Sequence, residues 1–542
     1  MTPTVTAVLL AVLAFAAYRV LRIGSRAHGL PPGPPTVPLL GNILQFPIKN
    51  AHFKLAEWAR RYGEVYTIKL GPGTAIFLNS PAAIKEILDK HSMDTIDRPP
   101  CYFNELVTDG MNLPLSRYSD RWRRMRKAAN HLLSSSAVLD YLPIQEAEST
   151  QLVFDIATTP ERYYTHIQRF SNSIILSIAY GQRSPRFETP SAVELVHATE
   201  LWASINAPGK HPPIDLVPVL KWLPERLAPW KAESRTIRAL QSKYYTEFFD
   251  QTEARIAASQ EGRGDASYFM ADLIRSQSAH GLDRLAMSYL GGALFEAGTD
   301  TSAHFLHSLV LLLIKYPETQ ARAREEVDRI VGERIPVYDD AESLPYLRAM
   351  LRETHRMMPV TPTGVPHRAQ CDLNYKGYLI PKDAVIFPNV YAMFHDPDIF
   401  EDPDVFNPDR FLQTPHGTLS GVDDVDWRST FVFGAGRRIC PGMHLATAST
   451  TLAAMKLIWA FVFSPALDSN TGKEIPLRLD ALCEGVSTGP KPFECMICPR
   501  GNGRLETLRK AFKVDAAPIL SAFEHHLTKE DSEWLRDVRG DQ

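Results

Sequence analysis

The chain has 542 residues, of which 44% are hydrophobic and 22% are charged. These proportions are ordinary for a globular protein, so the chain can bury a large core. Its 59 basic and 62 acidic residues give a formal net charge of −3. This balance argues against a nucleic-acid partner, because proteins that bind nucleic acids normally carry a strongly basic domain. Six cysteines, sparse and without regular spacing, exclude a fold held together by disulfides.

Residues 1–23 predict a membrane anchor. Residues 5–18 are uncharged and almost wholly apolar, and basic side chains follow them at Arg19 and Arg22. A helix of about 20 apolar residues spans a bilayer, and a slightly shorter one can do so when flanking arginines reach the interface. The positive-inside rule then places the rest of the chain in the cytosol. Two alternatives remain: a cleaved signal peptide, which would need a basic start, and a buried core helix.

Beyond the anchor, the composition divides the chain into three further segments. Residues 24–36 are basic and contain Pro-Pro-Gly-Pro-Pro, which predicts a stiff hinge in extended polyproline conformation. We expect residues 37–500 to form one domain, since no repeat or linker divides them. Residues 501–542 form a more charged C-terminal extension of unknown role, in which residues 519–538 could make a separate amphipathic helix.

Within the domain, the residue patterns predict a mainly α-helical fold with a smaller β region. Helical periodicity dominates residues 81–358. The longest predicted helix runs from its N-cap Asp283 to Lys315, is apolar on nearly all faces and should pass through the centre of the domain. Alternating segments predict strands over residues 65–70 and 74–78, which form a hairpin, over residues 374–380, and near residues 493–497.

Residues 433–442, with the sequence FGAGRRICPG, form the strongest motif. The glycines let the backbone approach a flat ligand and point its amides toward a sulfur, and Arg438 is placed to pair with a carboxylate. The segment resembles the haem-binding signature F-x-x-G-x-R-x-C-x-G of the cytochrome P-450 superfamily at every specified position. The resemblance implies that Cys440 is the axial ligand of the iron of haem b. Around this cofactor it places Phe433, Gly434, Gly436 and Arg438. The alternative is a buried cysteine in a glycine-rich turn.

A second motif supports the resemblance. Glu353 and Arg356, three residues apart, lie on one helix face where a carboxylate and a guanidinium can meet. They precede the cysteine as the family's E-x-x-R pair does. Between the two motifs, residues 406–411 resemble the family's P-E-R-F element, with Asp409 in place of the usual Glu. The resemblance implies that Arg410 completes a buried Glu–Arg–Arg cluster, which stabilises the fold around the haem.

The third motif, Ala-Gly-Thr-Asp-Thr at residues 297–301, lies midway along the long apolar helix. A buried acid beside a hydroxyl is costly unless it is paired or used. The segment resembles the family's A-G-x-D/E-T, which lies above the distal face of the haem. By resemblance, Thr301 helps to bind oxygen and a water molecule, and Asp300 relays protons, which makes these two the catalytic residues. The alternative for Thr301 is a hydrogen bond back to a carbonyl one turn earlier.

The fourth motif concerns the carboxylates of the cofactor. Trp122 and Arg126, one turn apart, resemble the family's W-x-x-x-R helix, whose members contact a haem propionate. His367 is expected at the other propionate, and arginine pairs well with such carboxylates. Neighbouring basic side chains could meet an acidic reductase, or could simply form a solvated helix face. These are Arg123, Arg124 and Lys127.

The resemblance covers roughly residues 30–500 and implies a haem-thiolate catalytic domain with the cytochrome P-450 fold. It implies a monooxygenase that takes electrons from NADPH through NADPH-cytochrome P-450 reductase and oxidises an apolar small molecule with O2. The anchor, the hinge and the ending PKPFECMICPR are similar to microsomal fungal members involved in secondary metabolism, for example of terpenoids. Such members are single-pass proteins of the endoplasmic reticulum membrane with a cytosolic catalytic domain.

Three alternatives stay open at this point. They are a haem-thiolate isomerase or dehydratase that does not use O2, a fatty-acid or xenobiotic hydroxylase, and a membrane-bound haem or lipid carrier. The substrate cannot be predicted, because the segments expected to line the pocket are largely apolar or small and discriminate poorly. By family analogy these segments are residues 98–115, 202–222, 291–301, 359–365 and 484–489.

Overall fold

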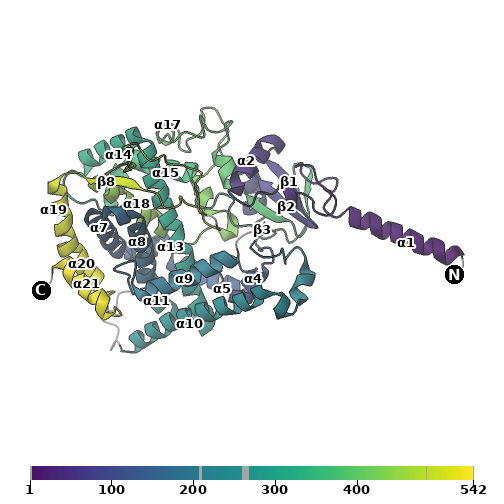
Figure 1. Cartoon of the computed structure of the whole chain (residues 1–542), viewed down its shortest axis with the longest axis horizontal. Coiled ribbons are helices and arrows are strands. Elements are labelled where there is room, and N and C mark those ends of the chain that lie inside the picture. Colours follow the sequence, from purple (N-terminus) through teal and green to yellow (C-terminus); the bar gives the residue numbers. More distant parts are fainter. Residues whose placement is uncertain (1–2, 207–209, 259–267, 484, 541–542) are drawn as a thin grey trace.

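The computed structural model describes residues 3–206, 210–258, 268–483 and 485–540. They form a helical body from which one helix, α1, projects, with strands β1–β3 on the side that carries α1 (Figure 1). The predicted mainly α-helical fold with a smaller β region is confirmed. The helices are α1 (Pro3–Leu21), α2 (Ala51–Tyr62), α3 (Pro81–Ile84), α4 (Tyr102–Thr108), α5 (Asp120–Leu132), α6 (Ser135–Asp140), α7 (Leu142–Thr158), α8 (Tyr163–Tyr180), α9 (Pro190–Ile205), α10 (Pro229–Ala258), α11 (Phe269–Arg275), α12 (Gln277–His280), α13 (Arg284–Lys315), α14 (Pro317–Ile330), α15 (Pro345–Met357), α16 (Val390–Phe394), α17 (Arg410–Gln413), α18 (Met443–Ala460), α19 (Asn502–Ala511), α20 (Ala517–Ser521) and α21 (Lys529–Arg539). The strands are β1 (Val65–Leu70), β2 (Gly73–Leu78), β3 (His367–Arg368), β4 (Leu373–Tyr375), β5 (Tyr378–Ile380), β6 (Val385–Pro388), β7 (Phe461–Pro465) and β8 (Cys495–Pro499).

Helix α13 runs through the centre of the body (Figure 1) and confirms the predicted long apolar helix. Its N-cap is Asp283, whose side chain accepts a hydrogen bond from the amide of Ala286 at 2.8 Å, and it ends just before Pro317. Its side chains are buried over most of its length, and it packs most extensively on α8. A Cβ atom at Gly292 would lie 2.4 Å from the ring of Tyr245, so glycine is what lets α10 come this close.

In the described part of the chain, the largest sheet has four strands in the order β1-β2-β6-β3. Strands β1 and β2 form the predicted antiparallel hairpin, β6 joins β2 in parallel, and β3 pairs antiparallel with β6. Strand β3 also bridges to Ile96 and Asp97. This pairing places His367 beside the loop that precedes α4.

Two other strand predictions need correction. The single strand predicted over residues 374–380 is a hairpin of β4 and β5, because Lys376 and Gly377 turn the chain with φ angles of 49° and 84°. The strand predicted near residues 493–497 is β8, which begins at Cys495 and pairs antiparallel with β7. Neither correction moves an element that carries one of the four motifs.

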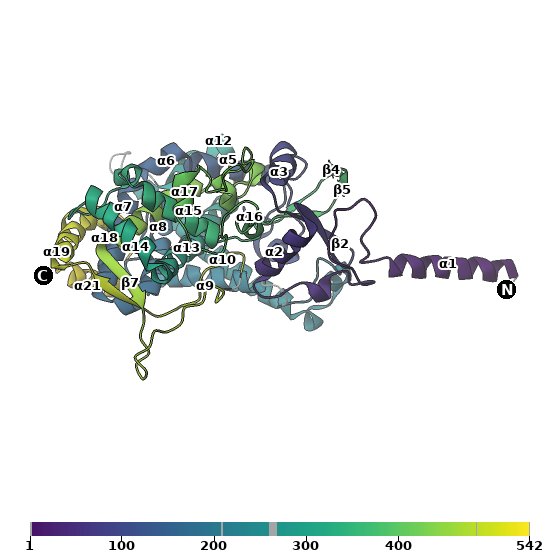
Figure 2. The ribbon, with the colours of Figure 1, turned by 90° about the horizontal axis from the view of Figure 1, so that it is seen from above.

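In the N-terminal region, helix α1 projects from the body (Figure 2), whereas the proline-rich segment after it packs against the domain. The large apolar side chains described for α1 are exposed. Among the described residues, no helix is apolar and long enough to cross a membrane. The proline-rich segment is not a free spacer: the carbonyl of Pro32 accepts a hydrogen bond from the amide of Thr67 at 2.7 Å, and Gly33 is buried against the same strand. The segment therefore fastens the start of the domain to β1.

The C-terminal extension belongs to the helical body (Figure 1). It contains α19, α20 and α21, so the single helix predicted over residues 519–538 is wrong. The chain breaks there because Thr528 begins a new helix, with its side chain accepting a hydrogen bond from the amide of Asp531 at 3.2 Å. The extension packs on α7, where the ring of Phe512 stacks on that of Phe154 with centroids 4.3 Å apart. It is therefore an integral layer of the fold.

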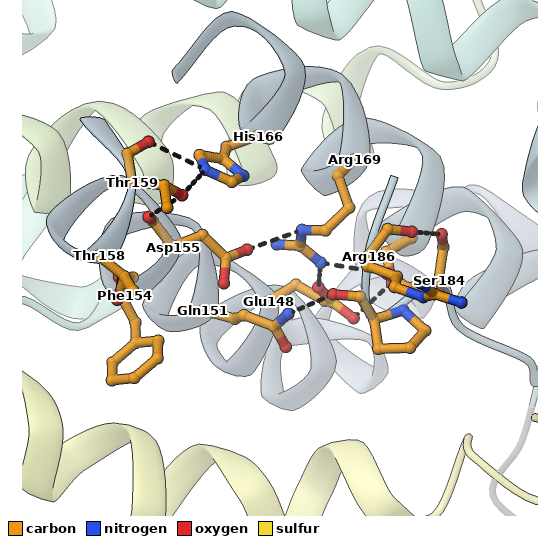
Figure 3. Close-up of polar contacts among 12 residues, drawn as sticks. Glu148, Gln151, Phe154, Asp155, Thr158, Thr159, His166, Arg169, Ser184 and Arg186 are labelled. Carbon is orange, nitrogen blue, oxygen red and sulfur yellow. Dashed lines mark hydrogen bonds and ion pairs between the residues drawn. The ribbon is translucent and has the colours of Figure 1, made fainter. Parts of the chain in front are cut away.

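A buried ion-pair network joins α7 and α8 (Figure 3). Glu148 on α7 is fully buried and accepts hydrogen bonds from Arg169 at 2.5 Å and from Arg183 at 2.9 Å. Arg169 also lies 3.1 Å from Asp155, two turns further along α7. Burial opposes ionisation, but the two guanidinium groups hold the pKa of Glu148 below its ordinary value. Removing one partner would leave an uncompensated charge in the core.

Candidate active site

The cysteine loop leads directly into helix α18. The amide of Cys440 donates a hydrogen bond to the carbonyl of Phe433 at 2.8 Å, which closes the loop. Gly434 and Gly436 both have positive φ angles, of 87° and 58°. A Cβ atom at Gly436 would lie 2.0 Å from the carbonyl oxygen of Leu88, so no other residue fits there. The glycines therefore give the loop the shape in which it presents the cysteine.

The side chain of Cys440 is half-buried and lies in a positive environment. Burial raises the pKa of its thiol, whereas the backbone amide of Gly442 and the charge of Arg126 act to lower it. Arg126, on α5, donates a hydrogen bond to the carbonyl of Ile439, the residue before the cysteine. The amide and the guanidinium favour the thiolate, the form that ligates metals, but burial outweighs them, so the pKa of the thiol is raised overall.

A cluster of basic side chains, buried except for the half-buried Arg126, lies beside the loop, and we call it the cation cluster. Its members are Arg98, Arg126 and Arg438, and the buried imidazole of His367 lies close enough to feel the charges of Arg98 and Arg438. Burial, together with the charges of Arg98 and Arg126, lowers the pKa of Arg438 to about 8. Burial and Arg126 lower the pKa of Arg98 to about 9, and burial and Arg98 keep that of His367 well below its ordinary value. Such mutual repulsion is relieved when an anion binds.

Asp97 is the carboxylate that offsets this positive charge, but it already pairs with two other arginines. Asp97 accepts hydrogen bonds from Arg117 and Arg368, each at 2.9 Å. Burial would raise the pKa of Asp97, but these cations hold it below its ordinary value. In addition, the Nε of Arg126 is buried with no hydrogen-bond partner in the described part of the chain. The cation cluster thus has both surplus charge and an unused donor to offer to a carboxylate.

Trp122 and His367 position the cluster. The indole Nε1–H of Trp122 donates to the carbonyl of Leu113 at 3.0 Å, and the guanidinium of Arg438 lies 3.8 Å from the centroid of the indole ring. Trp122 therefore supports Arg438 and has no ring donor left for a ligand. The Nδ1 of His367 pairs with the carbonyl of Thr95 at 2.9 Å, which leaves Nε2 as the nitrogen that can face a ligand.

The third motif lies on a turn of α13 that the surrounding side chains leave uncovered. Ala297 and Asp300 are exposed there, although Phe295 and Phe305 on either side of them are buried. Partial desolvation by the surrounding protein, together with the charge of Glu200, raises the pKa of the Asp300 carboxyl. The turn therefore presents an acid that keeps its proton to higher pH than an ordinary aspartate.

The Thr301 hydroxyl donates a hydrogen bond to the carbonyl of Ala297 at 2.7 Å. This is the alternative considered from the sequence, and it means that the hydroxyl has to rotate before it can contact a ligand. Of the segments predicted to line a pocket near this turn, residues 207–209 and 484 lie outside the described residues.

The predicted Glu–Arg–Arg cluster is confirmed. Arg356 donates to the two carboxylate oxygens of Glu353 at 2.7 and 2.8 Å, and Arg410 donates to the same carboxylate at 3.1 Å. All three side chains are buried. Asp409, which stands where the family usually has Glu, pairs with Arg322 on α14 instead. The cluster ties α15 to the segment before the cysteine loop and is structural.

Arg98 is the member of the cation cluster that the sequence patterns did not single out. Its Nη1 donates to the carbonyls of Val365 at 2.9 Å and Pro366 at 2.7 Å, which ties the loop before α4 to the strand that begins at His367. Locally it is only an arginine followed by two prolines. The signal that identifies it is the set of long-range contacts, and these need the fold.

A cysteine presented by a glycine-rich loop, with basic side chains beside it, can ligate a metal-containing cofactor that carries carboxylate groups. A family model described as cytochrome P-450 matches residues 31–495. The chain therefore belongs to the cytochrome P-450 family and is an oxidoreductase.

Several fungal proteins are similar over nearly their whole length. A cytochrome P-450 monooxygenase of Armillaria gallica is 38% identical over 506 residues, which are 93% of this chain and 96% of that protein. The monooxygenase yanC of Aspergillus niger is 37% identical, with 91% of this chain and 94% of that protein covered. The monooxygenase patI of Aspergillus clavatus is 35% identical, with 93% and 95% covered. The chain thus covers more than nine-tenths of the length of each of these relatives.

The residues present fit a thiolate-ligated haem. Cys440 would supply the sulfur ligand, and the backbone amide of Gly442 lies where it favours the charged form of that sulfur. The unused donor of Arg126 and the charge of Arg438 would suit the carboxylate groups of a haem.

Proposed function

We propose that this protein is a monooxygenase that uses O2 and electrons from NADPH to hydroxylate or otherwise oxidise an apolar small molecule. The observation that carries the proposal is the uncovered turn of α13, where Asp300, with its raised pKa, stands next to the hydroxyl of Thr301. Such a pair can hold and pass on protons, and O2 activation consumes protons. An isomerase or dehydratase of the family has no need of this pair.

In this proposal, Cys440 ligates the iron of haem b, and the cation cluster holds the propionates. Bound haem supplies the oxygen chemistry, which a thiolate ligand favours by donating electron density. Asp300 retains its proton to a higher pH than an ordinary aspartate because it is desolvated. It can pass that proton to Oγ1 of Thr301 once this hydroxyl leaves the carbonyl of Ala297.

The proposed substrate is an apolar molecule of fungal secondary metabolism, such as a terpenoid. The relatives named above come from fungi, which supports this setting. A fatty-acid or xenobiotic hydroxylase is the alternative, and a screen of apolar compounds for shifts of the haem spectrum distinguishes the two by the class that binds.

The proposal includes a membrane and an electron donor. The exposed apolar side chains of α1, followed by Arg22 and Arg26, support attachment to the endoplasmic reticulum membrane with the catalytic domain in the cytosol. Exposed basic residues on α5 support docking of NADPH-cytochrome P-450 reductase through an acidic surface. These are Arg123, Arg124 and Lys127.

Turnover with purified reductase, NADPH and a bound substrate tests the proposal. A monooxygenase consumes O2 and NADPH in proportion to product. Product formation without O2 would instead identify an isomerase or dehydratase. A haem or lipid carrier would form no product, and its properties would not change in the Asp300→Asn and Thr301→Ala variants.

A further inference from the structure

Glu296 lies on α13 one turn before Asp300, so the two side chains share one face of the helix. Its carboxylate accepts a hydrogen bond from Oη of Tyr245 at 2.5 Å and another from Nε2 of Gln241 at 2.7 Å. A third comes from Nδ2 of Asn112 at 3.0 Å. Helix α13, helix α10 and the loop between α4 and α5 therefore meet at this one side chain.

The three partners of Glu296 are uncharged. Burial raises the pKa of its carboxyl to about 7, and the hydrogen bonds from Tyr245 and Asn112 oppose this only in part. A buried carboxyl without a cation is costly, and a neutral amide would link the same elements at lower cost. Carboxyls with shifted pKa values of this kind cluster at functional sites.

Gln241 provides an independent observation. Its side chain is fully buried, and its amide nitrogen is committed to Glu296. Its carbonyl oxygen has no hydrogen-bond partner among the residues that the structure describes. The Glu296 carboxylate also keeps acceptor capacity, since a carboxylate can accept about four hydrogen bonds and three are made. What these two side chains lack is a hydrogen-bond donor.

We infer that Glu296 and Gln241 form a polar anchor that selects a substrate carrying a neutral hydroxyl group. This inference rests on the proposed function and names the substrate class for the same site. A hydroxyl supplies the missing donor, and the rest of the molecule is apolar. Glu296 precedes Asp300 by four residues, so at the helical rise the anchored hydroxyl would lie about 6 Å along α13 from Asp300. A protonated amine also supplies a donor and would pair with the ionised carboxylate, so it is the rival ligand.

Binding to the haem-loaded enzyme tests the inference with matched probes. The pairs are naphthol with methoxynaphthalene and geraniol with geranyl methyl ether, and naphthylmethylamine serves as the amine. Dissociation constants come from the shift of the haem spectrum. In the unmodified enzyme we expect each alcohol to bind about tenfold more tightly than its ether, the factor for one such hydrogen bond. Glu296→Gln should abolish this preference.

Two further variants make the result specific. Glu325→Gln removes an exposed carboxylate on α14 and should leave the preference for alcohols unchanged. Tyr245→Phe keeps the Glu296 carboxylate but removes one donor that orients it, so it should leave an intermediate preference. Tyr245→Phe also serves as the test if the Glu296 variant does not fold.

The outcomes separate this inference from the proposed function. No spectral shift with either alcohol, equal binding of alcohol and ether, or an unchanged preference in Glu296→Gln each overturns it. Tighter binding of the amine than of the alcohol overturns the substrate class. An unchanged preference with less product per NADPH would assign Glu296 to proton delivery and also overturn it. An unmodified enzyme that lacks the haem-thiolate spectrum contradicts the proposed function instead.

Discussion

Arg183 and Glu524 are 341 residues apart in the sequence, and their side chains pair at 2.6 Å. Arg183 is fully buried and also donates to Glu148 on α7. Glu524 lies in the C-terminal extension, where it pairs with Arg539 at 2.5 Å as well. The extension therefore completes the charge balance of the network between α7 and α8, and this gives it a structural role.

Glu524→Gln should destabilise the protein, because it leaves the buried guanidinium of Arg183 with too little negative charge. We expect the free energy of unfolding in urea to fall by about 3 kcal/mol, the lower end for removing one partner of a buried pair. Glu506→Gln on α19 removes an exposed carboxylate of the same extension and is the control. Equal stability of the two variants would show that the extension does not depend on this pair.

Arg438→Ala should weaken haem retention. The variant removes a buried guanidinium assigned to a propionate, and hydrogen bonds to charged groups contribute about 1.5–3 kcal/mol, or about tenfold or more in affinity. Transfer of haem to a competing apoprotein measures the effect. Arg437→Ala changes the exposed neighbouring arginine and should retain haem normally. Identical transfer rates in the two variants would remove Arg438 from the cofactor site.

Thr301→Ala should uncouple NADPH consumption from product formation. If its hydroxyl passes protons, its loss should lower product per NADPH by about tenfold or more, in line with the usual contribution of a positioned acid–base group. Ser308→Ala is a matched control, since Ser308 on the same helix also donates to a carbonyl one turn earlier, at 2.8 Å. If Thr301→Ala forms as much product per NADPH as the unmodified enzyme, the Thr301 hydroxyl serves only to bond the carbonyl of Ala297.

The stability of the protein should depend on pH through Glu296. Burial raises the pKa of this carboxyl from 4.5 to about 7, so the folded protein keeps a proton that the unfolded chain loses. The free energy of unfolding should therefore decrease as pH rises through this window, by at most about 1.4 kcal/mol per pH unit. The titratable groups around it, Tyr180, Tyr245 and Tyr289, have raised pKa values and do not titrate there. Glu296→Gln should flatten the profile; parallel profiles for the two proteins would contradict this.

Contiguous segments made the motifs and the central helix predictable. The glycines and the cysteine of residues 433–442 stand close together in the sequence, and so do Glu353 and Arg356, which a single helix turn brings into contact. The helix capped by Asp283 was predictable for the same reason, because its cap and its apolar length are local properties.

Long-range partners were not predictable from the sequence. The structural role of Arg98 depends on its hydrogen bonds to the carbonyls of Val365 and Pro366. These residues lie 267 and 268 positions further along the chain. Residues 519–538 of the C-terminal extension were likewise predicted as a separate helix, because the bond from Arg183 to Glu524 joins residues far apart in the sequence. Gln241 and Glu296 lie on different helices, so no local pattern links them.

The absorption spectrum of the reduced, carbon-monoxide-bound protein tests the central claim most directly. If Cys440 ligates haem iron as a thiolate, the unmodified protein should give the red-shifted band of a thiolate-ligated haem, and Cys440→Ala should lose this band and all activity together. A Cys440→Ala protein that keeps either the band or the activity would contradict the account.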